Sequence, residues 1–428
     1  MSSPLPLESG AVVTPRKKAS IWNLNFFLLW QGQLISALGD TIYAIALGFW
    51  VLEKTGSTAL MGTLMAVSSL PRILVSPFAG VLVDRLNRKW MLVAMDAVRG
   101  VAVVLLAVAA YSGVAQVWMV FAVGIVIGLG AAFFNPAVGS ALPDLVPASA
   151  IVQANAAFAM LGTGSGMVGS AAGGFLFQLL GAPLMFLLNG VSYVFAAAAA
   201  LPIRVPRVTH ATSEFQFFQD LRAGLAFVWQ YRGIRTIVLS AAALNFFANM
   251  GIMLLLPLFQ QSAALGAGRY GVLMAGLTGG MFAGFLLTSL GHVPFHRRFA
   301  VFYVCGVVSM AAAGFVPIWL NMPAMLSLAV LFGLTNAVLN SFLGATLQTA
   351  VPQDMRGKVF SLFMMIAGGL TPIAFAAGGA LAEVVPVRLL ISASFAVTLV
   401  CFAPLAASRP LRRLVQFNPE ADSLECIR

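Results

Sequence analysis

The residues of this sequence that could do chemistry are polar and ionisable side chains inside long apolar stretches. Asp40 lies in such a stretch, where a charge in hydrocarbon costs at least ~2.5–3.5 kcal/mol. Spacings of three, four and three residues put a polar stripe on one face of its helix: Gln33, Ser36, Asp40 and Tyr43. Arg72, in the next apolar stretch, is predicted at a similar depth. The two residues are therefore predicted to form an ion pair in which Asp40 couples transport to protons, with a static structural pair as the open alternative.

Carboxamide side chains form a second polar group in the apolar stretches. Four asparagines make two pairs with a spacing of four residues, and a fifth ends the fourth stretch. Such groups either bind a ligand or join neighbouring helices by hydrogen bonds worth about 0.6 kcal/mol each, and both interpretations stay open. The residues predicted to line a substrate cavity are Gln33, Ser36, Tyr43, Asn135, Asn245, Asn249, Asn336 and Asn340.

The composition indicates the surroundings of these groups. Of 428 residues, 60% are hydrophobic and 9% are charged, against about 25% charged residues in a soluble domain. A surface this apolar is stable only in a lipid bilayer. The net charge of +11 is explained by basic residues in cytoplasmic loops, so no nucleic-acid partner is expected. Three cysteines and three histidines lack metal-ligand spacing, which predicts neither a cofactor nor an enzyme.

Twelve apolar segments are long enough to cross the bilayer as helices. We therefore predict an all-α membrane protein with an N-terminal six-helix bundle over 1–203, a linker with an amphipathic helix over 204–233, and a C-terminal bundle and tail over 234–428. The distribution of Lys and Arg places both termini in the cytoplasm. The segments fall near 22–52, 57–82, 90–112, 116–137, 155–181 and 184–203, and near 234–260, 269–290, 299–318, 323–346, 358–382 and 387–406.

The two sets of six segments are an internal repeat. At an offset of 205 residues, Gly128 corresponds to Gly333, and Gly173 with Gly174 corresponds to Gly378 with Gly379. At an offset of 209, the run that begins at Gly62 corresponds to the run that begins at Gly271. Repeats of equal orientation are related by an axis along the membrane normal. We therefore expect two pseudo-symmetric six-helix bundles with a substrate cavity at their interface.

The loop between the second and third segments resembles motif A of the major facilitator superfamily, G-x-L-x-D-R-x-G-R-K, and the resemblance covers nearly the whole chain. Asn87 replaces the second glycine of the motif and keeps access to left-handed backbone conformations. In that family the loop forms a cytoplasmic latch in which Asp84 would pair with basic residues and a helix N-terminus. The cytoplasmic gate implied by this resemblance, extended by an acid and a base of the third segment, is Gly80, Asp84, Arg85, Arg88, Lys89, Asp96 and Arg99.

Further motifs narrow the resemblance. The stretch from Gly169 to Gly174 is similar to motif C of antiporter-type exporters, although Ser170 stands at the position of the motif's proline. The run 27–33, the turn 134–137 and the segment 351–359 are similar to the macrolide-efflux and enterobactin-exporter branch. Members of that branch expel bulky, partly apolar compounds by using the proton gradient, and the same activity is expected here.

These observations together predict a secondary exporter that works by alternating access and couples the efflux of drug-, macrolide- or siderophore-like compounds to protons. A lipid or lysophospholipid carrier and an uncoupled facilitator are the alternatives. The expected partners are a small-molecule substrate, protons and the lipid bilayer, and the protein is expected to be a monomer. The expected location is the bacterial cytoplasmic membrane.

Overall fold

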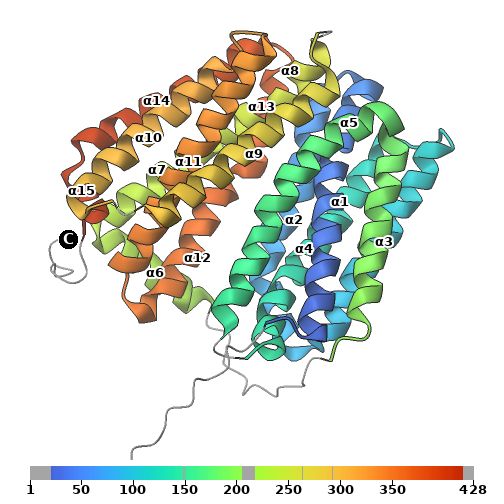
Figure 1. Ribbon diagram of the computed structural model, residues 1–428, viewed down its shortest axis with the longest axis horizontal. Coiled ribbons are helices and arrows are strands. Elements are labelled where there is room, and N and C mark those ends of the chain that lie inside the picture. The colour runs from blue at the N-terminus through green and yellow to red at the C-terminus, as the bar shows by residue number, and fades with distance from the viewer. Residues whose placement is uncertain (1–20, 148–149, 205–216, 263, 292, 418–428) are drawn as a thin grey trace, which may run out of the picture.

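The computed structural model describes residues 21–147, 150–204, 217–262, 264–291 and 293–417, and for a few helical residues in these ranges only the backbone is described. We use the name N-terminal half for α1 to α5 and the name C-terminal half for α7 to α15 (Figure 1). The helices of the N-terminal half are α1 (Leu24–Thr55), α2 (Thr58–Arg85), α3 (Arg88–Tyr111), α4 (Val117–Leu145) and α5 (Ile151–Ala200).

The C-terminal half follows helix α6 (Phe217–Gln230). Single residues separate α7 from α8 and α12 from α13, so each of these pairs crosses the molecule as one unit. A short 3₁₀ turn (Ala403–Ala407) joins the last two helices. The helices are α7 (Arg232–Met253), α8 (Leu255–Gln261), α9 (Gly266–Leu290), α10 (Phe295–Phe315), α11 (Met322–Ala350), α12 (Gln353–Gly369), α13 (Thr371–Leu381), α14 (Val387–Phe402) and α15 (Arg409–Val415).

Helix α5 contains two of the predicted membrane crossings. Gly181 has φ 70° and ψ 172° inside it, a conformation that glycine adopts without steric cost. Pro183 follows and cannot donate a backbone hydrogen bond, so the helix bends where the sequence predicted one span to end and the next to begin. Eleven helical segments of the described chain are long and apolar enough to span a membrane. Because α5 is long enough for two, the prediction of twelve membrane helices is confirmed.

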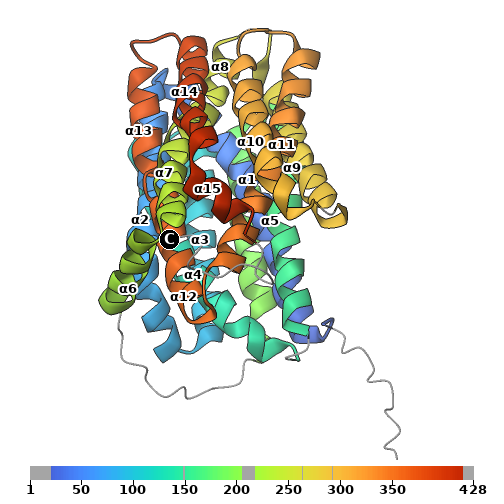
Figure 2. The same cartoon turned by 90° about the vertical axis from the view of Figure 1, so that its left-hand side faces the viewer.

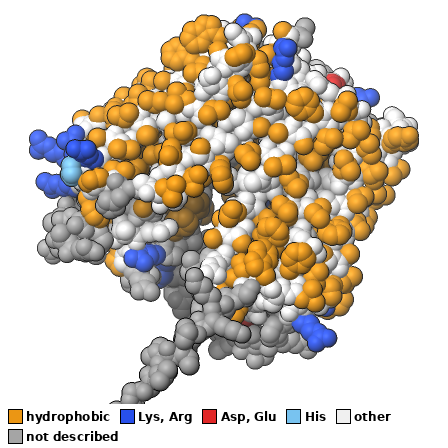
Figure 3. Space-filling model, in the orientation of Figure 1, with side chains coloured by type: hydrophobic (Ala, Val, Ile, Leu, Met, Phe, Trp, Pro, Cys, Tyr) orange, Lys and Arg blue, Asp and Glu red, His pale blue; other side chains and the backbone are white. Residues whose placement is uncertain are grey.

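The surface is that of a protein surrounded by lipid. Apolar side chains cover most of the face shown in Figure 3, while the basic side chains lie mainly near its periphery. Large apolar residues such as Leu179 and Leu290 are about 80% and 78% exposed, which water would not tolerate over so wide an area. Eleven apolar spans and an apolar outer surface identify a multi-pass membrane protein.

The amphipathic helix predicted in the linker corresponds to α6 (Figure 2). Val228 is buried, Leu221 is partly buried against the same core, and Leu225 is 37% exposed. Helix α15 lies across the same half with Leu411 and Leu414 buried. Both helices thus cover the C-terminal half at the end opposite to the α1–α2 connection.

The buried apolar side chains connect the halves at one end of the molecule. The largest cluster includes residues of both halves, for example Phe49 of α1 and Phe259 of α8. We name this end, where α1 ends and α2 begins, the α1–α2 end. Toward the other end the buried clusters are separate: one contains only residues of α6 and the C-terminal half, and two contain only residues of the N-terminal half. Among the described residues, the two halves therefore share a core at the α1–α2 end.

Glycines allow the close approach of the halves at the α1–α2 end. A Cβ atom on Gly62 of α2 would come closer than 3.0 Å to the backbone carbonyl oxygen of Phe375 in α13, and it would lie 3.0 Å from the Cα atom of Gly379. A Cβ atom on Gly174 of α5 would come equally close to the backbone of α9, next to Gly271. Figure 1 shows α5 beside α9, and Figure 2 shows α13 beside α2. These two glycine contacts bring backbone against backbone, a packing mode typical of membrane helices.

Candidate functional site

The carboxylate of Asp40 is held by the second span of α5. The Tyr193 hydroxyl donates a hydrogen bond to Asp40 Oδ1, and Asn189 Nδ2 donates another to the same oxygen at 3.5 Å. The guanidinium of Arg99 is the positive charge that acts on this carboxylate. As a whole residue Asp40 is half-buried.

The expected ion pair between Asp40 and Arg72 is not formed. Both residues are described, Arg72 is exposed, and it has no ion pair in the described part of the chain. The depth estimate from the sequence gave no information on which helix faces meet. Helix α2 packs mainly on α4 and α13, whereas α1 packs mainly on α5. The basic residue near Asp40 is therefore Arg99 of α3.

Arg99 forms a buried ion pair with Asp96, one turn earlier on α3. Its guanidinium lies 4.5 Å from the ring centroid of Tyr193 and 4.8 Å from that of Phe134. Asp96 is 1% exposed and Arg99 is 5% exposed. Arg99 thus does not extend to a membrane surface, and the structure brings both residues to Asp40 rather than to the motif A loop.

Two glycines make room for these side chains. A Cβ atom on Gly39 would lie 2.5 Å from Asn189 Oδ1, so α1 can approach the hydrogen-bonding residues of α5 only with glycine there. A Cβ atom on Gly130 of α4 would lie 2.6 Å from Cδ of Arg99. The local sequence of α1 and α4 therefore permits the burial of the charged groups.

We define the N-terminal charge cluster as Asp40, Asp96, Arg99, Asn189 and Tyr193. With both carboxylates ionised it carries one net negative charge, and a single proton neutralises it. Because net charge is costly in an apolar interior, the arrangement can hold one exchangeable proton. Asp96 is fully buried against Arg99, whereas Asp40 is half-buried. Asp40 is thus the less deeply buried of the two acidic residues.

The other members of the polar stripe on α1 lie in different surroundings. Ser36 is buried and donates to the backbone carbonyl of Gln33 at 3.4 Å. Tyr43 is 5% exposed, packs on Phe186 at 5.3 Å between ring centroids, and its hydroxyl has no hydrogen-bond partner among the described residues. Gln33 is half-buried. The substrate-cavity role of these three residues stays a prediction.

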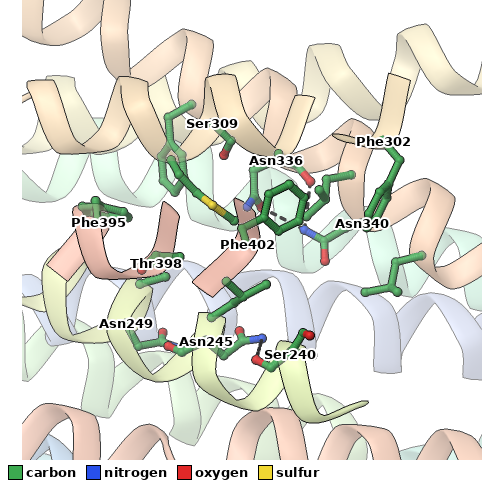
Figure 4. Close-up of a pocket in the computed structure, with 18 of the residues that line it drawn as sticks. Ser240, Asn245, Asn249, Phe302, Ser309, Asn336, Asn340, Phe395, Thr398 and Phe402 are labelled. Carbon is green, nitrogen blue, oxygen red and sulfur yellow. Dashed lines mark hydrogen bonds between the residues drawn. The ribbon is translucent and has the colours of Figure 1, made fainter. Parts of the chain in front are cut away.

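A cavity of about 260 Å³ lies inside the C-terminal half (Figure 4). Asn245 and Asn249 of α7 form one wall, and Asn336 and Asn340 of α11 form the opposite wall. Helices α10 and α14 close the deep side. Its lining is mostly apolar: Ile237, Ser240, Ala241, Leu244, Asn245, Ala248, Asn249, Ile252, Leu277, Met281, Phe302, Gly306, Ser309, Met310, Phe332, Gly333, Asn336, Leu339, Asn340, Leu343, Phe395, Thr398, Phe402, Leu405 and Leu411.

The four paired asparagines are thus brought together, but within one half. The sequence predicted a cavity at the interface between the halves, and this one is lined only by residues of the C-terminal half. Asn135, exposed on α4, is not among the lining residues. Asn245 and Asn340 are exposed while Ser309 and Thr398 are buried. Asn245 and Asn340 therefore lie at the mouth of the cavity, and Ser309 and Thr398 lie deeper.

The motif A loop joins α2 to α3 by a short connection. Asn87 has φ −71° and accepts hydrogen bonds from the backbone N–H groups of Lys89 and Trp90, so it is the N-cap of α3. Asn87 therefore does not adopt the left-handed backbone conformation that glycine or asparagine would allow at this position. Arg88 pairs with Asp144 near the end of α4 and donates to the Ser140 carbonyl at 3.0 Å. This pair ties α3 to α4 within the N-terminal half.

The remaining gate residues are only partly described. The ammonium group of Lys89 lies 5.6 Å from the ring centroid of Trp90. Gly80, Asp84 and Arg85 belong to α2, but their surroundings lie outside the described part of the structure. The latch expected for Asp84 therefore stays a prediction.

At the α1–α2 end a carboxylate of the C-terminal half caps a helix of the N-terminal half. Glu383 Oε1 accepts hydrogen bonds from the backbone N–H of Ala59 and the hydroxyl of Ser57, each at 2.8 Å, and from the hydroxyl of Thr58 at 3.1 Å. Chiefly the Ala59 N–H holds the pKa of Glu383 below its ordinary value. An anion at a helix N-terminus also complements the helix dipole. The Thr58 hydroxyl also lies 3.1 Å from the Gly379 carbonyl, so its single hydrogen is shared between these two acceptors.

Several of these residues were not identified in the sequence. Asn189 and Tyr193 in the sixth span were signalled only by their polarity in an apolar run, since their spacing of four residues matches that of the asparagine pairs. Asp144 lies beyond the predicted end of the fourth span near residue 137, so it was not identified. Nothing in the local sequence indicated a role for Glu383, because its contact with Ala59 joins residues that are 324 positions apart in the chain.

The fold and the site together define a class of protein. Two helical halves that share a core at one end, with a charge cluster inside one half and a mostly apolar cavity with asparagines inside the other, are typical of a membrane transporter. The family model described as Major Facilitator Superfamily matches residues 29–376, which is most of the chain. The chain therefore belongs to the Major Facilitator Superfamily and is a transporter rather than an enzyme.

Curated relatives match along nearly their whole length. Macrolide efflux protein A of Streptococcus pyogenes is 25% identical over 392 residues, which cover 89% of this chain and 91% of the relative. The multidrug efflux pump Tap of Mycobacterium tuberculosis is 25% identical over 412 residues, which cover 92% of this chain and 96% of the relative. The resemblance to the macrolide-efflux branch is confirmed by these relatives.

Solved structures share the fold. A bacterial homologue of the iron transporter ferroportin, in an inward-facing state, superposes with a TM-score of 0.67 at 16% identity and covers 90% of this chain and 98% of its own. A POT family transporter in complex with 5-aminolevulinic acid gives a TM-score of 0.68 at 11% identity, covering 90% and 96%. At these identities the similarity establishes the major facilitator fold.

Proposed function

We propose that this protein is a secondary exporter that works by alternating access and couples the efflux of bulky amphipathic compounds to the entry of protons. Support for efflux comes from the two relatives, whose names are those of drug efflux proteins and of which the match covers 91% and 96%. Support for the mechanism comes from the arrangement of the halves and from the position of the charge cluster.

The observation that carries the proposal is the symmetry of the contacts between the halves. The internal repeat relates Gly62 to Gly271 and Gly174 to Gly379. The contact between Gly62 and Gly379 is therefore the repeat-related mate of the contact between Gly271 and Gly174. Two equivalent contacts on either side of a central axis form a symmetric closure, which separates when the halves rock as rigid bodies.

In the proposed orientation both termini lie in the cytoplasm of a bacterial cell, and the α1–α2 end faces the outside. The state with a shared core at that end is then closed to the outside. Export requires a second state in which the two glycine contacts separate and the halves approach at the cytoplasmic end. The motif A loop and the Arg88–Asp144 pair lie at that cytoplasmic end.

The proton is assigned to Asp40 in the N-terminal charge cluster. A proton on Asp40 removes the net negative charge and leaves the buried pair of Asp96 and Arg99 intact. Coupling requires that water reaches Asp40 from opposite sides in the two states and that the affinity for the proton differs between them. The proton gradient then favours one direction of the cycle.

The testing experiment is the accumulation of a panel of hydrophobic antibiotics and dyes in cells that produce the protein, with and without a protonophore. We expect lower accumulation in producing cells and loss of that difference with the protonophore. Efflux that is insensitive to the protonophore would indicate an uncoupled facilitator and would contradict the coupling.

Variants of α1 test the assignment to Asp40. Asp40→Asn should abolish proton-driven dye uptake into inverted vesicles while folded protein remains in the membrane, and Asp40→Glu should retain part of the activity because it keeps a titratable group. Glu53→Gln, an exposed acid on the same helix, is the matched control. Proton-driven uptake at the wild-type rate in Asp40→Asn would refute the assignment.

A further inference from the structure

Two membrane spans of the C-terminal half end beside each other at a group of basic side chains. The span of α10 begins at Phe295, the span formed by α14 and the 3₁₀ turn ends at Ala407, and each has 21 residues. The Tyr303 hydroxyl of α10 donates to the Ala403 carbonyl at 3.2 Å. At about 1.5 Å per residue, such spans are about as long as the hydrocarbon layer is thick. Residues at these two ends therefore lie at the level of the lipid headgroups.

The basic residues at these ends form one group. Five of its six members are exposed, and Arg298 is half-buried. We name it the α10–α15 basic cluster and define it as His296, Arg297, Arg298, Arg409, Arg412 and Arg413. Figure 3 shows Lys and Arg side chains gathered around a histidine at the edge of the C-terminal half. The cluster is thus a charged patch on a surface that is mostly apolar.

Contacts between α15 and α10 hold the members of the cluster together. Gln416 Nε2, just after α15, donates to the backbone carbonyl of His296 at 2.6 Å. The guanidinium carbon of Arg412 lies 5.1 Å from the ring centroid of Phe299 in α10. The apolar side chains of α15 are buried, which leaves its arginines on the outer face. The positive charges are therefore fixed on two packed helices.

The guanidinium groups are arranged to bind an anion. The guanidinium carbon of Arg298 lies 3.8 Å from the ring centroid of Phe295, and that of Arg412 lies over Phe299 in the same way. Each of the two groups uses one N–H on a backbone carbonyl and has four others. A guanidinium over an aromatic ring presents its N–H groups at its edge, where phosphate oxygens accept them in pairs.

The described residues provide no negative charge beside the cluster. Their two ion pairs both belong to the N-terminal half, and Glu383, the acid of the C-terminal half whose side chain is described, lies at the α1–α2 end. On α15 the spacing of three and four residues after Arg409 puts like charges on one helix face, which costs free energy. The helix dipole favours the cations of the last turn but does not reduce their repulsion from those of α10. An anion would remove this repulsion.

We propose that the α10–α15 basic cluster binds the phosphate group of an anionic phospholipid at the bilayer surface that these span ends meet. The level of the cluster favours a lipid, because acyl chains can lie along the exposed face of α10 that continues from Arg297 through Ala300 to Val304. Its charge favours anionic lipids over zwitterionic ones, whose headgroup amine it would repel. The inference does not rest on the proposed function, because the exported compound, the direction and the coupling ion do not enter it.

The test is lipid titration of the delipidated full-length protein in detergent, followed by native mass spectrometry. The two lipids are phosphatidylglycerol and phosphatidylcholine with the same acyl chains. We expect the first phosphatidylglycerol to bind at least about ten-fold more tightly, since several arginines near the headgroup each contribute. Equal affinities would overturn the proposal. Displacement of phosphatidylglycerol by millimolar inorganic phosphate would identify a phosphate site and would overturn the choice of a lipid.

Variants locate the lipid at the cluster. The triple variant Arg409→Gln, Arg412→Gln and Arg413→Gln should bind both lipids with similar affinity. The corresponding triple lysine variant keeps the charge and should retain part of the preference for phosphatidylglycerol, which separates loss of charge from loss of folding. Unchanged selectivity in the glutamine variant would overturn the site.

The matched control removes the same charge from the opposite end of the protein. Lys54→Gln, Arg269→Gln and Arg388→Gln change three exposed cations at the α1–α2 end. The control should keep the wild-type preference for phosphatidylglycerol. A loss of preference as large as that of the cluster variant would indicate a general effect of net charge and would contradict a defined site.

An acidic segment of the same chain is the other occupant to test. Glu420, Asp422 and Glu425 follow α15 in the sequence and lie outside the described residues. The full-length variant with Glu420→Gln, Asp422→Asn and Glu425→Gln should bind phosphatidylglycerol with the wild-type affinity. A rise of about ten-fold or more would show that this segment occupies the cluster and would overturn the assignment to a lipid.

Discussion

Adding a single methyl group at Gly174 should open the α1–α2 end. In Gly174→Ala, the new Cβ would approach the backbone carbonyl of Ala267 to less than 3.0 Å and would also meet Gly271. These are backbone atoms, so the contact is relieved only when α5 and α9 separate. Overpacking of this kind costs typically about 1–3 kcal/mol, which shifts a two-state equilibrium by about 5- to 150-fold. The separated state should therefore become strongly populated.

The measurement is double electron–electron resonance between spin labels on cysteines placed at Lys54 and Val384, in a protein whose native cysteines are replaced. Both positions are exposed at the α1–α2 end, one in each half. We expect a new, longer distance component in Gly174→Ala and in its repeat-related counterpart Gly379→Ala. The control is Gly164→Ala on the same helix, where a Cβ meets nothing within 4 Å. A wild-type distance distribution in Gly174→Ala would refute the role of the glycine contacts.

Two further predictions concern other contacts of the structure. Glu383→Gln should shift the same spin-label distances toward the separated state, but less than Gly174→Ala because an exposed charge is screened. Since the pKa of Glu383 is lower in the joined state than its ordinary value of 4.5, the contact stabilises that state above this value and is lost as the pH falls below it. In Gly130→Ala the methyl group would displace Arg99, which should lower the free energy of unfolding by about 1–3 kcal/mol and reduce dye efflux. Gly139→Ala is the control, because a Cβ atom at Gly139 meets nothing within 4 Å, and it should change neither quantity.

The number and order of the helices could be predicted from the sequence because each span is an apolar run of sufficient length. The bend of α5 lies at Gly181, where the sequence predicted one span to end and the next to begin. The repeat even identified the glycine pairs that meet at the α1–α2 end, although the sequence did not show that Gly62 contacts Gly379 rather than its own counterpart Gly271. Contacts between halves depend on packing that no local pattern encodes.

The charge cluster was predicted in part for the same reason. Asp40 was recognised because an acid in hydrocarbon is costly, and the need for a cationic partner followed. Which cation meets it depends on the rotation of each helix about its axis, so Arg72 was expected and Arg99 is found. The asparagine pairs were recognised by their spacing of four residues, while their position inside one half depended on the packing of α7 against α14 and of α11 against α10.

The most direct test of the account is the number of protons released when a substrate binds. In a weakly buffered solution of the purified protein with a pH indicator, addition of a saturating dye from the efflux panel should release about one proton per bound dye near neutral pH, because the N-terminal charge cluster has one more acid than base. Asp40→Asn should bind the dye and release none. Release of a proton by Asp40→Asn at the wild-type level, or binding without release by the wild type, would contradict proton-coupled export through Asp40.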